Sequence, residues 1–206
     1  GTYVQNFGRY LTEIGFSVSV VCSEMYKKPK KFKDGLITVY PIIPNKPSIL
    51  IYYISRVPLI KVFSRLLFYF HNGLKIYRFL LGLNKVSKID FIEYTEGGDF
   101  WNAFTKKFKY ATHLHGSAYT FMKQSGVLKS EAYWISRRLE HLFIKRANKV
   151  FSPSYAMLNL VEKEMKQKLR QAHVIPYPID ESGIIKYRKS KKVRLLFASR
   201  NDPVKA

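Results

Sequence analysis

A histidine and a group of carboxylates are the residues of this 206-residue chain whose types suit chemistry on a polar substrate. His115 can donate or accept a hydrogen bond near neutral pH, and Gly116 after it lets a ligand approach the backbone closely. Glu93, Glu96 and Asp99 are close in sequence and suit a general base or the binding of a sugar hydroxyl group. The same residues also fit structural roles, as a histidine at the end of a strand and a solvated turn, so their types alone leave both interpretations open.

Two further features near these residues bear on ligands. His113 and His115 make a His-x-His pair, and because side chains alternate across a strand, both rings are expected on one face. No cysteine or nearby carboxylate cluster completes a tetrahedral set, so neither a metal site nor a metal cofactor is predicted. Gly1 and Thr2 precede an amphipathic run, and a glycine at the start of a helix lets a phosphate reach unpaired backbone N–H groups.

Alternating strands and helices must position these residues. Apolar residues at helical spacing alternate with β-branched runs between turn signals, which predicts a Rossmann-like α/β fold with a parallel sheet covered by helices on both faces. In such a sheet, ligands bind beyond the carboxyl ends of the strands. The expected strands are residues 16–22, 36–40, 90–94, 111–114, 149–152 and 172–175, and the expected helices are residues 3–14, most of 47–83, 100–108, 131–147 and a segment that starts at 153.

Local patterns add four narrower expectations. Residues 23–35 carry five lysines and are expected to form a solvated loop. Cys22 ends an apolar run and is expected to be a small buried hydrophobe. Pro153 is expected to start a helix that a neighbouring serine caps. Glu140 is expected on the polar side of its helix, in an ion pair with Arg137.

Composition excludes several classes of protein. The chain has 36 basic and 14 acidic residues, a net charge of +22, which favours anionic partners and phosphates first among them. The sequence contains no Walker loop, Ser-His-Asp ordering or zinc-finger spacing. It therefore lacks the residues that a kinase or a hydrolase would need. It also lacks a signal peptide and an uncharged apolar stretch of about 18–20 residues, which argues against an integral membrane protein. Together with the single cysteine, this favours a cytoplasmic location.

Several short motifs occur in an order that points to one family. The first helix ends in Leu-x-x-x-Gly-Phe, and a His-Gly pair follows a central strand. Next come a glutamate, a helix, the run Lys-Arg-Ala-Asn-Lys-Val, a strand and Ser-x-Ser. The last motif is Val-Ile-Pro-Tyr-Pro-Ile-Asp. These motifs stand at Leu11–Phe16, His115-Gly116, Glu140–Ser154 and Val174–Asp180. In this order and spacing the chain resembles the acceptor-side domain of GT-B glycosyltransferases of the family-4 type.

The resemblance implies the N-terminal half of a GT-B fold. Residues 1–180 are expected to form the acceptor-side domain, with its first strand ahead of Gly1, residues 181–192 a linker, and residues 193–206 the first strand and loop of a truncated nucleotide-sugar-binding domain. The implied activity is that of a retaining glycosyltransferase of the hexosyltransferase type, which transfers a sugar from a nucleotide sugar to a glycan or lipid-linked acceptor in cell-surface polysaccharide or glycolipid synthesis. This chain alone is expected to be inactive.

The resemblance also implies roles for single residues. His115 takes the catalytic position close to the transferred sugar. The donor is expected to contact Gly1, Arg200 and Lys205, of which Arg200 and Lys205 match the cations that hold the diphosphate in that family. The family's usual Lys-Gly is Lys205-Ala206 here, so the loop that holds the diphosphate departs from the family pattern at its glycine. The acceptor is expected to contact Thr2, Glu93, Glu96, Gly116 and Ser117.

Two other functions remain open from the sequence. Residues 47–83 combine many aromatic side chains with five cations, which fits either packing against the sheet or a peripheral contact with an anionic membrane surface, including a membrane-binding domain without catalysis. The net charge and the 16% aromatic content also fit a nucleic-acid-binding α/β protein. However, no RNA or DNA module is recognisable, so nucleic acid is expected to bind only non-specifically.

Overall fold

The computed structural model describes residues 2–23, 31–44, 58–116 and 131–177. Helices and strands alternate along these segments, as the sequence predicts. The helices are α1 (Thr2–Glu13), α3 (Pro58–Val86), α4 (Phe100–Thr105), α6 (Glu131–Arg146) and α7 (Tyr155–Met165). The strands are β1 (Ser19–Ser23), β2 (Phe32–Asp34), β3 (Ile37–Ile42), β4 (Ile92–Thr95), β5 (Tyr110–His113), β6 (Lys149–Ser152) and β7 (Ala172–Val174).

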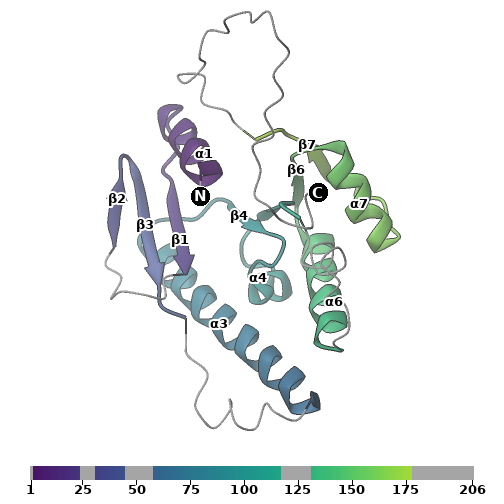
Figure 1. Ribbon diagram of the computed structural model, residues 1–206. Coiled ribbons are helices and arrows are strands. Elements are labelled where there is room, and N and C mark those ends of the chain that lie inside the picture. The colour runs from purple at the N-terminus through teal and green to yellow at the C-terminus, as the bar shows by residue number, and fades with distance from the viewer. Residues whose placement is uncertain (1, 24–30, 45–57, 117–130, 178–206) are drawn as a thin grey trace, which may run out of the picture.

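The strands form two sheets (Figure 1). One has the order β1-β3-β2, and the other has the order β4-β5-β6-β7 with every neighbouring pair parallel. This arrangement confirms the predicted Rossmann-like α/β class. The expectation that all of residues 23–35 form a loop is wrong, because Phe32–Asp34 is strand β2 and pairs antiparallel with β3. Gly35 makes this hairpin possible, since its φ of 60° lies in the left-handed region that glycine adopts without strain.

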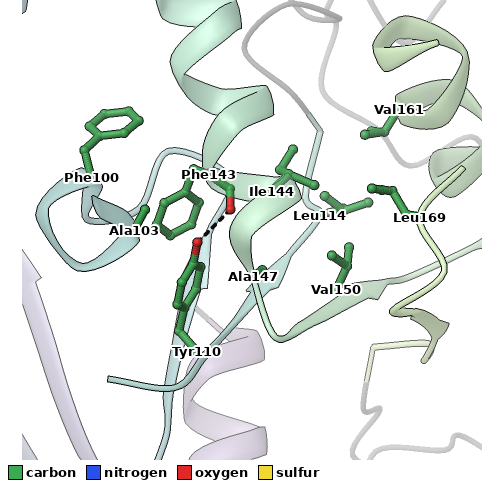
Figure 2. Packing of buried hydrophobic residues seen from close by; sticks show 10 residues of the cluster. All are labelled: Phe100, Ala103, Tyr110, Leu114, Phe143, Ile144, Ala147, Val150, Val161 and Leu169. Carbon is green, nitrogen blue, oxygen red and sulfur yellow. Dashed lines mark hydrogen bonds between the residues drawn. The ribbon is translucent and has the colours of Figure 1, made fainter. Parts of the chain in front are cut away.

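The two faces of the larger sheet differ. One packs against an apolar core, and the other carries polar side chains. Tyr110 and Leu114 point into a core built with α4, α6 and α7 (Figure 2). Side chains alternate across a strand, so Thr112, which is fully buried, is on the same face. Phe143 and Ile144 of α6 are fully buried there, and the Tyr110 hydroxyl donates a 2.8 Å hydrogen bond to the Phe143 carbonyl oxygen. The alternate residues of β4 and β5 face away from this core, towards α1.

Helix α3 connects the two sheets, and its described side chains bear on one of the open interpretations. Tyr77 and Leu80 are buried in a cluster against which Val21 of β1 and Ile92 of β4 pack. Phe79 lies 5.3 Å from the ring of Tyr40, measured between centroids. The described aromatic side chains of α3 therefore pack inside the protein, as the packing interpretation predicts.

Three local expectations differ from the structure. Cys22 is exposed rather than buried, because it lies on β1, a strand at the edge of its sheet. Glu140 is only 5% exposed, so it does not lie on a solvated side of α6. Pro153 precedes the helix instead of starting it: α7 begins at Tyr155, and the Ser154 side chain accepts a hydrogen bond from the Met157 N–H. The expected linker and donor-domain strand lie outside the described residues and stay predictions.

Gly98 tests how tightly the core face is packed. A Cβ at this position would lie 2.6 Å from Cε1 of Phe143 and 2.8 Å from Cβ of Tyr94, whereas a Cβ at neighbouring Gly97 would meet nothing within 4 Å. We expect Gly98→Ala to lower the free energy of unfolding by about 1–3 kcal/mol or more. Gly97→Ala is the matched control and should leave it nearly unchanged. Equal urea-unfolding midpoints for the two variants would contradict this packing.

Candidate functional site

The candidate site lies on the polar face of the larger sheet, where β4 and β5 end. The register pairs Glu93 with Ala111 and Thr95 with His113, which sets the Glu93 and His113 side chains diagonally across the same face. His115 follows two residues after His113 and returns to this face. The start of α1 completes the site, because Tyr3 contacts both Glu93 and His113. Three separate parts of the sequence thus meet near the strand ends, where an α/β sheet binds its ligands.

Glu93 is the acceptor that connects three elements. Its Oε1 atom accepts a 2.7 Å hydrogen bond from the Tyr3 hydroxyl and lies 3.3 Å from Nδ1 of His113. The His113 side chain is 3% exposed and that of Glu93 is 24% exposed, so this contact is largely shielded from water. Burial, and then the hydrogen bond to Glu93, raise the pKa of the Tyr3 hydroxyl well above its ordinary value, which keeps it protonated and donating.

Glu96 holds the backbone of the His-Gly pair. Its Oε1 atom accepts hydrogen bonds from the N–H groups of His115 and Gly116, the second at 2.7 Å. Glu96 is 6% exposed, so these N–H groups would lose an acceptor in a poorly solvated place if the carboxylate were absent. The carboxylate therefore fixes the turn that directs the His115 side chain.

The His115 ring stands in a stack of rings. It lies 4.7 Å from the ring of His113 with an angle of 11° between planes, and 5.6 Å from the ring of Tyr177 with an angle of 16°. Nδ1 of His115 lies 2.7 Å from the Tyr177 hydroxyl oxygen. Burial and the adjacent His113 lower the pKa of His115, and Glu96 and Glu93 oppose this shift. His115 is therefore mainly neutral at pH 7.

Asp99 is the buried N-cap residue of α4, the helix that follows β4. Its Oδ1 atom accepts a 3.0 Å hydrogen bond from the Trp101 N–H and caps α4. Its Oδ2 atom and the Tyr94 hydroxyl are both buried, without a hydrogen-bond partner among the described residues. Burial raises the pKa of Asp99 to about 7, although the backbone N–H groups of Trp101 and Asn102 partly offset this.

The structure brings together four of the nine site residues that the sequence predicts, and four others lie outside its described part. Glu93, Glu96, His115 and Gly116 meet at one edge of the sheet, and Thr2 is the first residue of α1, next to Tyr3. The remaining predicted residues lie outside the described part of the chain; these are Gly1, Ser117, Arg200 and Lys205.

Sequence reasoning missed two residues of the site and gave a third a different use. Tyr3 has the helical spacing of a packing residue, so its hydroxyl contact with Glu93 left no sign in the pattern. Tyr177 lies in the segment after the last strand, and this position beyond a strand end was the signal that could have identified it. His113 was weighed only as half of a metal pair. Among the described residues, no group of three or more histidine, cysteine or acidic side chains is placed to hold a metal ion.

The arrangement suits the binding of a polyhydroxylated molecule. Carboxylate oxygens accept hydrogen bonds from hydroxyl groups, a neutral histidine can donate or accept one, and aromatic rings offer an apolar surface beside them. A family model for Glycosyltransferase Family 4 matches residues 1–182, which include the whole site described above. The chain belongs to glycosyltransferase family 4. A search of curated proteins found no match to it.

Membership of glycosyltransferase family 4 confirms the family that the motifs predicted and supports a transferase that acts on a sugar donor and an acceptor. The described helices include none that is long and apolar enough to cross a membrane.

Replacement of Glu96 tests its role in holding the His-Gly turn. Glu96→Ala leaves two shielded N–H groups without their acceptor, and we expect it to lower the free energy of unfolding of this family-4 domain by about 2–4 kcal/mol. Glu96→Gln keeps an acceptor oxygen of the same reach and should cost less than half as much. Urea unfolding measures both, and an equal loss in the two variants would contradict the proposed contact.

Asp99 should make stability depend on pH. Because its pKa is about 7 in the folded protein and near 4 in the unfolded chain, the folded form binds the proton more tightly, and stability from this group falls as the pH rises from 4 to 7. Asp99→Asn keeps a capping oxygen without the charge, so it should stabilise the protein relative to wild type by about 1–3 kcal/mol at pH 8 and much less at pH 4.

The matched control is Asp90→Asn, which changes an exposed carboxylate. It should show no such pH-dependent gain, because a surface ion pair contributes little to stability. A difference between Asp99→Asn and wild type that stays constant from pH 4 to pH 8 would refute the raised pKa.

Proposed function

We propose that this family-4 chain is the acceptor-side part of a retaining glycosyltransferase of the hexosyltransferase type. Its substrates are a nucleotide sugar and a glycan or lipid-linked acceptor, in the synthesis of cell-surface polysaccharide or glycolipid. The observation that carries the proposal is the position of His115, held by Glu96 and Tyr177 beyond the carboxyl ends of the strands, within the range that matches the family.

In the proposed reaction, His115 binds the sugar that is transferred, and the Gly116 backbone leaves room for it. The neutral ring suits this role, since it can hydrogen-bond an uncharged hydroxyl group without introducing a cation beside the carboxylates. Glu93, Glu96 and Thr2 line the acceptor side together with Ser117. The donor diphosphate is assigned to Gly1, Arg200 and Lys205, and the reaction uses no metal ion. This chain without a complete donor domain is inactive under the proposal.

A peripheral membrane contact is a second proposal, which rests on one surface of α3. The described exposed positions of this helix are Leu67, His71, Lys75, Arg78, Gly82, Lys85 and Val86. The three cations among them, Lys75, Arg78 and Lys85, recur at helical spacing. Each basic side chain near an anionic leaflet contributes about 1 kcal/mol. Under this proposal the enzyme works at the cytoplasmic face of a membrane. Replacing Arg78 and Lys85 with Glu should weaken binding to vesicles that contain anionic lipid, and unchanged binding would reject the contact.

Donor binding is the first test of the enzymatic proposal. Calorimetry of the complete protein against a panel of nucleotide sugars should detect binding of at least one of them, and this 206-residue chain alone should bind none. The alternative is a nucleic-acid-binding protein. Tight, salt-sensitive binding of oligonucleotide by the complete protein, without binding of any nucleotide sugar, would overturn the proposal in its favour.

Replacement of His115 is the second test. In the complete protein, His115→Ala should lower kcat for sugar transfer about 100-fold, because a hydrogen bond at the reacting sugar is lost. His173→Ala is the matched control, since His173 is exposed on β7. An active His115→Ala enzyme with unchanged kcat would show that the ring has no part in the reaction.

A further inference from the structure

The contact between Glu93 and His113 defines the proton position on His113. An ionised carboxylate only accepts hydrogen bonds, so the 3.3 Å contact requires the proton to be on Nδ1 of His113. Tyr3 donates to the same carboxylate oxygen at 2.7 Å and restrains Glu93 from α1. Nε2 of His113 is buried and has no hydrogen-bond partner among the described residues. A neutral ring with its proton on Nδ1 satisfies Glu93 and leaves no buried N–H unpaired.

The His113 ring in turn defines where His115 lies. The two rings are nearly parallel at 4.7 Å, and the Tyr3 ring meets both at steep angles, 67° to His113 and 71° to His115. Tyr177 lies 5.5 Å from His113 and 5.6 Å from His115, measured between centroids. The His115 ring is therefore restrained by neighbours from β5, from α1 and from the segment after β7.

We propose that Glu93 and His113 are positioning residues for His115: Glu93 fixes the tautomer and place of the His113 ring, and that ring fixes the His115 ring so that its Nε2 atom meets a hydroxyl group of the sugar. This inference rests on the function proposed above and adds two residues that act through His115. The sequence assigned Glu93 to the acceptor and gave His113 no role in the reaction.

The groups around the His115 ring act on its pKa in opposite directions, and burial with the adjacent His113 ring outweighs the carboxylates. Two stacked imidazolium rings repel each other, so a proton on one ring opposes a proton on the other. The groups that face them are Tyr3 from α1, Glu93 and Glu96 from β4 and its turn, and Tyr177 after β7. Both tyrosine hydroxyls have a raised pKa and stay neutral, which leaves the two carboxylates as the charges that attract a proton. Their Oε1 atoms are occupied by other donors.

The first experiment follows the His115 ring by NMR in the complete protein with histidine labelled at Cε1. His113→Phe keeps a flat ring in the stack and removes the nitrogen that contacts Glu93. We expect the titration midpoint of His115 to rise, because the adjacent His113 ring is one of the causes that lower its pKa. The control His71→Phe changes an exposed histidine on α3 and should leave the midpoint in place. A His115 midpoint equal to that of wild type in His113→Phe would overturn the inference.

Glu93→Gln is the second variant and keeps the shape of the side chain. Its amide oxygen is a weaker acceptor than a carboxylate, so His113 should lose its single tautomer, which the ring nitrogen chemical shifts report. In sugar transfer by the complete enzyme, kcat should fall roughly tenfold or more, because the His115 ring is misplaced. His113→Phe should also move the acid limb of kcat/KM to higher pH, a shift that a merely structural role would not produce. An unchanged tautomer of His113 in Glu93→Gln would reject the role of Glu93.

The positioning network and the glycosyltransferase function can be rejected separately. If wild type transfers sugar but the tautomer of His113 and the midpoint of His115 do not respond to these variants, the positioning network is rejected and the glycosyltransferase function stands. If the NMR responses appear but the complete protein transfers no sugar from any nucleotide sugar, the function is rejected, and with it the substrate assigned to Nε2 of His115.

Discussion

The parallel register of β4 and β5 is the constraint on which the site depends. It places Glu93 and His113 on one face and Tyr94 and Tyr110 on the other. Because side chains alternate along a strand, a slip of β4 by one residue would turn Glu93 into the core and Tyr94 out of it. The slipped strand would bury a carboxylate among apolar side chains, a cost that excludes this alternative.

Packing on the core face stabilises this register, and the site residues on the polar face depend on it. Tyr94, Tyr110 and Phe143 form a group of aromatic rings with neighbouring centroids 4.7–5.7 Å apart. Rings of this size fill their space in few ways, so the strands cannot slide past each other without opening a cavity. The contact between Glu93 and His113 on the opposite face then needs no large interaction energy of its own. This contact is a consequence of the strand register, which packing in the core already determines.

The sequence predicted the alternation of elements and the places of the principal polar residues, but not the contacts among them. The His-x-His spacing was enough to put His113 and His115 on one face. The partner of His113 depends on the register between two strands separated by a helix, which no local pattern encodes. Cys22 shows the same limit, since its apolar neighbours predict burial and only its place at the edge of a sheet exposes it.

The distribution of charge separates two kinds of binding. The chain carries 36 basic and only 14 acidic residues, yet Glu93 and Glu96 both lie close enough to His115 to act on its pKa. Carboxylates accept hydrogen bonds from hydroxyl groups and repel phosphates, so this edge of the sheet suits the sugar and acceptor, and a nucleotide diphosphate needs cations placed elsewhere. This separation supports the proposal that assigns the diphosphate to basic residues outside the acidic turn. Burial and the adjacent His113 ring, rather than the carboxylates, lower the pKa of His115 and keep it uncharged.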